Sequence, residues 1–133
     1  MIPFRVSFDP GVGIREQVVY AAKKAVVSGQ MLPGDPFPSV RALSKALKIN
    51  PNTAHKVITQ LLAEGLLELH VGLGTVVARR PFSTAAERAN LLNTELEHLV
   101  VEAQKLGLDL DEVWEALSRH WRRLDVMEKV RKR

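Results

Sequence analysis

The sequence has no cysteine among its 133 residues, few aromatic residues and no long apolar run. The absence of cysteine excludes disulfide bonds, thiolate zinc sites and cysteine nucleophiles. No segment approaches the roughly 20 consecutive apolar residues that a membrane-spanning helix requires, and residues 1–15 lack the continuous apolar core of a signal peptide. We therefore expect a cytoplasmic protein with no membrane partner.

Sequence signatures of catalysis and of metal binding are also lacking. No set of serine, histidine and acid follows a nucleophile motif, and the histidines share no spacing typical of a metal site. Residues 72–75 are glycine-rich like a phosphate loop, but no lysine follows them and they do not lie between a strand and a helix. We therefore expect no enzymatic activity, no metal site and no resident cofactor. The histidines are His55, His70, His98 and His120.

Positive charge is concentrated in the first part of the chain. The formal net charge is +4 and the sequence pI is about 9.7. Residues 1–81 contain ten Lys and Arg against five Asp and Glu, whereas residues 82–133 contain nine against ten. A basic first part with a nearly neutral remainder favours a polyanionic partner such as nucleic acid for the first part.

Apolar residues recur at helical spacing in three segments of the first 65 residues. They predict a helix over residues 14–28, a short helix that begins after Ser39, and a third helix over residues 51–64. Three prolines and a glycine make residues 30–38 a loop. A short turn joins the second and third helices, and this arrangement is typical of a helix-turn-helix.

The third predicted helix has two different faces. Asn50 is a suitable N-cap, Pro51 suits the first turn, and Gly65 suits the position after the last turn. The inward face is apolar, and the outward face carries hydrogen-bonding groups and a cation near the start of the helix. The inward face consists of Ala54, Val57, Ile58, Leu61 and Leu62, and the outward face consists of Asn52, Thr53, His55 and Lys56. The pattern fits a helix that enters a DNA major groove, and it also fits an ordinary amphipathic helix with a solvated face.

Two short segments of alternating apolar residues follow, at residues 66–71 and 75–79. The turn between them contains Gly72 and Gly74, so the pattern predicts a β-hairpin. A hairpin directly after a helix-turn-helix makes a winged helix, and glycines at its tip let backbone N–H groups approach a phosphate closely.

Beyond Pro81 the sequence predicts a hairpin of two helices. Capping boxes over residues 84–87 and 109–112 begin the helices, and Gly107 ends the first. A heptad-like seam follows the first helix through Ala85, Ala89, Leu92, Leu96, Leu99, Ala103 and Leu106. Because about 40 residues rarely fold alone, we expect a dimer interface here. Its predicted residues are Leu92, Leu96, Leu99, Ala103, Leu106, Trp114, Leu117 and Trp121.

Four segments together resemble the GntR family of regulators. They are Leu32-Pro33-Gly34-Asp35-Pro36-Phe37-Pro38-Ser39-Val40-Arg41-Ala42-Leu43, Asn50-Pro51-Asn52-Thr53, Glu64-Gly65-Leu66-Leu67 and Gly72-Leu73-Gly74-Thr75-Val76-Val77. The short two-helix tail is similar to the YtrA-like subfamily. The resemblance implies a bacterial transcriptional regulator, usually a repressor, that binds palindromic operators as a dimer. YtrA-like members often control transporter operons.

The resemblance also implies roles for single residues. Arg41 would contact DNA from the second helix, and Ser39 would hold a phosphate at its start. His55 departs from the arginine that other subfamilies often have at this position, which leaves the base preference there open, and the neighbouring Lys56 is an alternative cation. The implied DNA contacts are Ser39, Arg41, Asn52, Thr53, His55, Lys56, Gly72, Gly74 and Thr75.

We therefore predict a mainly α protein with a small β-hairpin wing, in which an N-terminal winged helix-turn-helix precedes a two-helix dimerisation hairpin. Residues 1–11 form an arm, residues 12–80 the DNA-binding domain, and residues 81–133 the dimerisation region with a basic tail. The leading interpretation is a homodimeric repressor that binds a double-stranded DNA operator through residues 51–64 and 66–79. The alternative is a winged helix that binds another protein and has no operator. A small-molecule effector site between the winged helix and the tail is a further hypothesis.

Overall fold

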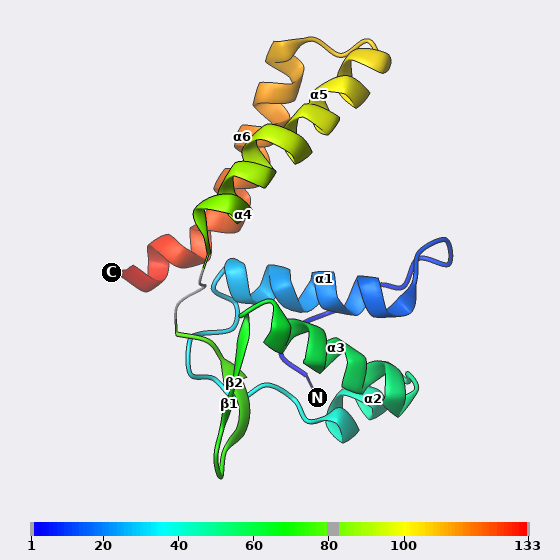
Figure 1. The fold of residues 1–133 in the computed structure, drawn as a ribbon, viewed down its shortest axis with the longest axis vertical. Helices are drawn as coiled ribbons and strands as arrows, with labels where there is room; N and C mark the ends of the chain where they lie inside the picture. Colours follow the sequence, from blue (N-terminus) through cyan, green and yellow to red (C-terminus); the bar gives the residue numbers. More distant parts are fainter. Residues whose placement is uncertain (1, 80–82, 133) are drawn as a thin grey trace. The chain divides into compact units, whose positions relative to one another are not determined.

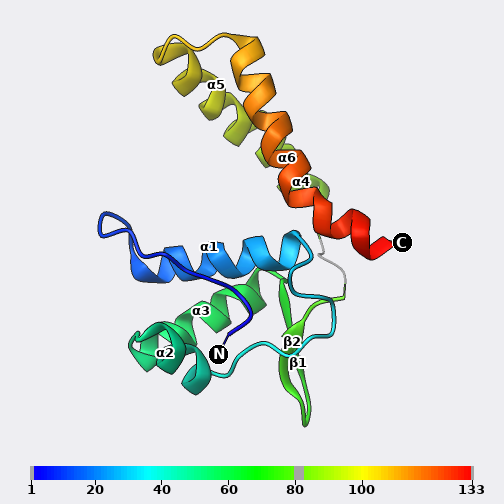
Figure 2. The ribbon, with the colours of Figure 1, turned by 180° about the vertical axis from the view of Figure 1, so that it is seen from behind.

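The computed structural model describes residues 2–79 and 83–132, and the side chains of this range up to Asp125. The chain divides into two compact units, a winged-helix unit within residues 2–79 and a helical unit within residues 83–126. The domain boundary that the sequence predicts between residues 80 and 81 lies outside the described residues. Figures 1 and 2 show the chain from opposite sides.

The winged-helix unit combines a helical core with one antiparallel β-hairpin (Figure 1). Its elements are α1 (Ile14–Val27), α2 (Val40–Leu47), α3 (Pro51–Ala63), β1 (Leu67–His70) and β2 (Gly74–Val77). α3 packs against both α1 and α2. In the hairpin, Leu67 lies opposite Val77 and His70 lies opposite Gly74. The predicted winged-helix fold, mainly α with a β-hairpin, is confirmed.

The core of this unit forms where the apolar faces of the helices meet. α3 buries Ala54, Val57, Ile58 and Leu61, as its periodicity predicts. α1 buries Val18, Val19, Ala22 and Ala25, and α2 buries Leu43. Since full burial of a large aliphatic side chain stabilises the fold by about 1.5–3 kcal/mol, this shared core holds α3 firmly while its opposite face stays exposed.

The ends of α2 and α3 follow the predicted capping. The Asn50 Oδ1 atom accepts a hydrogen bond from the backbone N–H of Asn52 at 2.8 Å, and the Ser39 hydroxyl accepts one from Ala42 at 3.1 Å. Gly65 follows α3 with φ of 79°, a left-handed conformation that favours glycine. Each side-chain cap stabilises its helix by about 1 kcal/mol.

The N-terminal arm packs into the core of the winged-helix unit. Phe4 is 4% exposed and stacks on Phe37, with ring centroids 5.9 Å apart and planes at 20°. Gln30 donates a hydrogen bond to a backbone carbonyl of the arm, and the Gln17 side chain bonds the backbone N–H and carbonyl of Asp9. The described part of the arm forms no β-strand; an aromatic contact and side-chain bonds hold it in place.

The proline-rich loop before α2 pairs with the wing. The backbone N–H of Gly34 donates to the Val77 carbonyl at 2.9 Å, and the Val77 N–H donates to the Asp35 carbonyl at 2.9 Å. The N–H of Phe37 donates to the Thr75 carbonyl at 2.8 Å. The loop therefore lies along the edge of β2, a position that tolerates proline, and it connects the wing to the segment that leads into α2.

The helical unit consists of α4 (Ala85–Asn90), the π-helical turn η1 (Leu91–Glu95), α5 (Leu96–Lys105) and α6 (Leu110–Lys132). Both predicted capping boxes are present. Thr84 and Glu87 exchange side chain-to-backbone bonds of 3.1 and 3.0 Å, and Asp109 and Glu112 exchange bonds of 2.9 and 3.2 Å. No helix in the described part of the chain is long and apolar enough to cross a membrane.

The π-helical turn corrects the predicted heptad seam. The sequence predicts one regular helix between the capping box at Thr84 and Gly107, but the backbone N–H of Leu96 bonds the carbonyl of Leu91, five residues earlier. This wider turn acts like one inserted residue and rotates the helix before it by about 100° relative to the helix after it. The predicted seam is therefore wrong as a continuous stripe: Ala85, Ala89 and Leu92 are out of line with Leu96, Leu99, Ala103 and Leu106.

Candidate nucleic-acid interface

The first two turns of α3 present the predicted recognition side chains outward. Asn52, His55 and Lys56 are exposed, and Thr53 is half-buried. The buried face of the same helix fixes its rotation, so these side chains cannot turn toward the core. Their amide, hydroxyl, imidazole and ammonium groups are hydrogen-bonding groups of the kind that reads base edges and contacts phosphates in a major groove.

The first turn of α2 supplies a second predicted contact. Arg41 is exposed in this turn, and Ser39 is exposed at the N-cap. The Ser39 oxygen accepts from the Ala42 N–H at 3.1 Å, but a hydroxyl also has a proton to donate. Ser39 can therefore cap α2 and donate a hydrogen bond to a phosphate oxygen at the same time. α2 packs directly on α3, which places both sets of contacts on one helix-turn-helix.

The wing extends as a β-hairpin whose turn requires its two glycines. Gly72 and Gly74 have φ of 83° and 81°, in the left-handed region. No atom outside the adjoining residues lies within 4 Å of where a Cβ would be at either position. Backbone conformation, and not crowding, therefore demands glycine here, and the tip is open to an incoming phosphate. Thr75 is half-buried, and its carbonyl is used by the loop before α2.

The wing also carries features that the sequence patterns did not single out. Leu69, Val71 and Leu73 are exposed, so the alternating pattern buries only Leu67 on this side of β1. Glu68 accepts hydrogen bonds from His70, at 2.9 Å, and from the backbone N–H of Arg79, at 3.3 Å. The bond to His70 is the main cause that lowers the pKa of Glu68. The wing is therefore an apolar-tipped element with one carboxylate at its base.

Sequence reasoning missed one cation near the recognition helix. Arg15, in the first turn of α1, donates a hydrogen bond from Nε to Gln60 of α3 at 3.0 Å. Arg15 lines one hollow together with the predicted DNA contacts Thr53 and Lys56. Because 45 residues separate Arg15 from Gln60, no local motif or spacing could have indicated this pairing.

The helical unit leaves most of its apolar side chains uncovered. Among the described side chains of residues 83–125, only Ala103 is buried. Trp114 and Trp121 are 63% and 70% exposed, and the predicted interface residues Leu92, Leu96, Leu99, Leu106 and Leu117 are all exposed as well. Exposed apolar side chains gathered in this way are typical of interaction surfaces.

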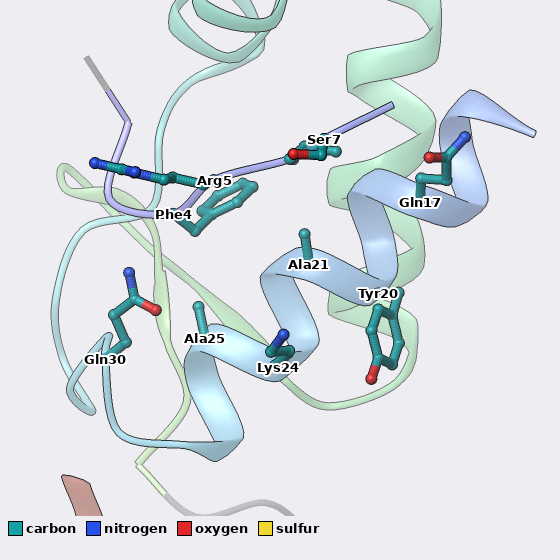
Figure 3. A pocket seen from close by; sticks show the side chains of 10 residues that line it. Phe4, Arg5, Ser7, Gln17, Tyr20, Ala21, Lys24, Ala25 and Gln30 are labelled. Atoms are coloured by element: carbon teal, nitrogen blue, oxygen red, sulfur yellow. The ribbon is translucent and has the colours of Figure 1, made fainter. Parts of the chain in front are cut away.

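A hollow of about 430 Å³ lies between the arm and α1 (Figure 3). Gln17 and Gln30 at its edges use their side chains to hold the arm. Figure 3 shows the Arg5 and Tyr20 side chains well apart and extending in different directions, so these polar groups do not converge on one point as they do in a ligand site. The hollow is therefore the space between α1 and an arm that side-chain hydrogen bonds hold in place.

Comparisons with known proteins agree with this geometry. A family model described as bacterial regulatory proteins of the gntR family matches residues 14–77. The chain is 32% identical over 113 residues to the HTH-type transcriptional repressor YtrA of Bacillus subtilis (strain 168), which covers 83% of this chain and 87% of that protein. It is also 31% identical over 105 residues to the HTH-type transcriptional regulator YhcF of the same strain, covering 79% and 84% of the two chains.

Solved structures show the same fold. A transcriptional antiterminator from Listeria monocytogenes EGD-e has a TM-score of 0.81 at 23% identity, with 92% of each chain covered. A GntR family transcriptional regulator from Listeria monocytogenes has a TM-score of 0.64 at 22% identity, covering 84% of this chain and 98% of that one.

The family match spans α1 to β2, the elements that carry the predicted DNA contacts. The similarity to YtrA, at 113 residues, is longer than the winged-helix unit and therefore extends into the helical unit. These findings favour DNA binding over the alternative of a protein-interaction module, and they identify a regulator, not an enzyme. The chain belongs to the GntR family of DNA-binding bacterial transcriptional regulators and is similar to its YtrA-like members.

Proposed function

We propose that the chain is a homodimeric repressor that binds a palindromic operator and controls an operon, with transporter genes as the expected target. It acts in the cytoplasm, where the operator is. Each protomer lays the start of α3 in a major groove, contacts the flanking backbone from α2, and places the wing on the adjacent phosphates. Half-sites one helical turn apart, or a small multiple of it, match a two-fold symmetric protein.

The observation that carries the proposal is the pairing of an exposed polar recognition face with an exposed apolar helical unit in the same chain. The recognition face, at Asn52, His55 and Lys56, is held by a buried core. Among the described side chains of the helical unit only Ala103 is buried, which is less core than so small a unit needs to fold alone. A second copy of the helical unit covers this surface and also gives the protein the two-fold symmetry of a palindrome.

The proposal is tested by selecting DNA from a random duplex pool with the wild-type protein and footprinting the enriched sequences. We expect a two-fold symmetric protected site, and we expect a copy of it in a promoter region of the source genome next to the regulated operon. Enrichment of an asymmetric site, or of no sequence at all, contradicts the proposal. A reporter fused to the identified promoter then distinguishes repression from activation.

A small-molecule effector that alters operator binding is a further part of the proposal. Thermal-shift screening of the full-length protein with metabolites tests it. A ligand that raises the melting temperature and changes operator affinity supports an effector. A flat screen leaves regulation to protein abundance or to a partner protein.

A further inference from the structure

Arg15 is held in place by a chain of side-chain bonds between α1 and α3. Its Nε atom donates to the Oε1 atom of Gln60 at 3.0 Å, and the Nε2 atom of Gln60 donates to Glu64 at 2.9 Å. The other oxygen of Glu64 lies 2.9 Å from the ammonium of Lys23. Both ends of the Gln60 amide are therefore engaged, so the guanidinium of Arg15 is oriented before any ligand arrives.

The orientation of Arg15 matters because of the hollow beside it. Arg15 and Glu16 line this hollow from the start of α1, and Thr53 and Lys56 line it from α3. The hollow is therefore lined by two cations, one hydroxyl and one carboxylate. Arg15 uses Nε for Gln60, and a guanidinium has four further N–H donors on its two terminal nitrogens for a second acceptor.

We propose that Arg15 and Lys56 hold one backbone phosphate of bound DNA in this hollow, with Thr53 donating a hydrogen bond to the same phosphate. The inference rests on the proposed function. Thr53 and Lys56 are predicted DNA contacts on one wall of the hollow, and Arg15 adds a contact from the other wall, on a helix outside the helix-turn-helix. The start of α1 and the start of α3 lie at the same end of the unit in Figures 1 and 2, so this phosphate flanks the groove that α3 enters.

The ligand that this site takes is a phosphodiester, whatever the base sequence. Phosphate contacts neutralise charge and release counterions, so each one steepens the salt dependence of binding. Glu16 has the opposite effect, because a carboxylate beside a phosphate is repulsive. Neutralising Arg15 should therefore weaken DNA binding, whereas neutralising Glu16 should strengthen it. A merely structural role would not produce these opposite changes.

The test measures binding of the full-length protein to a mixed-sequence duplex of about 30 base pairs by fluorescence anisotropy, at several salt concentrations. Arg15→Gln should lower the slope of log K against log salt by about 0.9 and weaken binding about eightfold near 0.1 M salt. Arg15→Lys should keep most of the slope, and Glu16→Gln should tighten binding. Lys24→Gln is the matched control, because it removes one exposed cation from the same helix outside this hollow.

An Arg15→Gln protein that is folded by circular dichroism and keeps the wild-type slope overturns the inference. Equal losses of DNA affinity in the Arg15→Gln and Lys24→Gln proteins also overturn it, because they indicate general charge attraction. Titration with inorganic phosphate alone provides a third arm: Arg15-dependent binding of free phosphate without any change in DNA binding assigns the site to a small anion instead. Failure of the proposed function appears separately, as the absence of an enriched sequence in the selection experiment.

Discussion

Arg41, His55 and Lys56 are exposed on two helices whose opposite faces are buried. Their backbone positions are therefore fixed by the core, and their side chains are free to meet DNA. Replacing them removes contacts without removing packing. Substitutions at these positions should change binding while leaving the free energy of unfolding within about 0.5 kcal/mol of wild type.

We predict that Arg41→Ala weakens binding to the selected operator by about 1–3 kcal/mol if the guanidinium reads a guanine, and that His55→Ala weakens it by a smaller amount. A competition assay between operator and mixed-sequence duplex gives both values. Lys45→Ala, an exposed cation on the same helix as Arg41, is the control. If Arg41→Ala and His55→Ala both leave operator affinity unchanged, the assigned contacts are wrong.

A second prediction at the scale of residues concerns pH. Hydrogen bonds from Lys23 and then from Gln60 lower the pKa of Glu64. Because the folded pKa lies below the unfolded one, the charged carboxylate stabilises the fold above the ordinary glutamate pKa of 4.5, and this contribution is lost as the pH falls below that value.

Glu64→Gln removes the titrating group. The free energy of unfolding of this variant should therefore fall less than that of the wild type as the pH falls from about 7 to about 3. Urea titrations across this range measure the difference. Glu115→Gln, at an exposed position of α6 in the other unit, controls for the change in net charge. Identical pH profiles for wild type and Glu64→Gln would show that the bonds between Glu64, Lys23 and Gln60 do not affect stability.

At the scale of elements, the π-helical turn decides which side chains share a face. It places the carbonyl of Leu91 against the N–H of Leu96, so Leu91 and not Leu92 lies one turn before Leu96. The two leucines are 62% and 63% exposed, so they are matched in exposure, and neighbouring residues of a helix point about 100° apart.

We therefore predict that Leu91→Glu weakens the proposed dimer more than Leu92→Glu does. The reason is that Leu91 extends the stripe of Leu96 and Leu99, whereas Leu92 points away from it. Sedimentation equilibrium gives the two dimerisation constants. The reverse order would mean that the helix returns to a regular α-helical phase when two copies associate.

Local chemistry explains which elements could be predicted from the sequence. Ser39, Asn50, Thr84 and Asp109 cap helices through bonds to residues two or three positions away, so their sequence context suffices. The π-helical turn, the pairing of the proline-rich loop with β2, and the bond between Arg15 and Gln60 depend on backbone geometry and on chain segments far apart. The predicted contacts on α2, α3 and the wing come from family motifs, whereas no motif indicates that Arg15 lies beside Thr53 and Lys56.

At the scale of the whole molecule, the chain has two tryptophans, Trp114 and Trp121. Both lie on α6 and both are exposed in a single chain. Tryptophan fluorescence therefore reports on the helical unit alone, without a label. If a second copy covers this surface, the emission of the intact protein depends on its concentration.

We predict that dilution shifts tryptophan emission to longer wavelength as dimers dissociate, and that Leu96→Glu or Leu99→Glu raises the dissociation constant about tenfold or more. The lost burial of each leucine, about 1.5–3 kcal/mol, accounts for the change. Leu69→Glu, at an exposed leucine of the wing, should leave the dimer intact. A dimer that persists in both the Leu96→Glu and the Leu99→Glu protein would place the interface elsewhere.

The pairing of the proline-rich loop with β2 has a consequence for how operators are chosen. The bond between Phe37 and Thr75 lies two residues before the N-cap Ser39 and one residue after Gly74. Together with the bonds of Gly34 and Asp35 to Val77, this bond joins the wing to the segment that leads into α2. If both elements contact DNA as proposed, their fixed separation disfavours duplexes whose phosphates are spaced differently, even when every contacted base is correct. We therefore expect the protein to discriminate between operators by DNA shape as well as by base sequence.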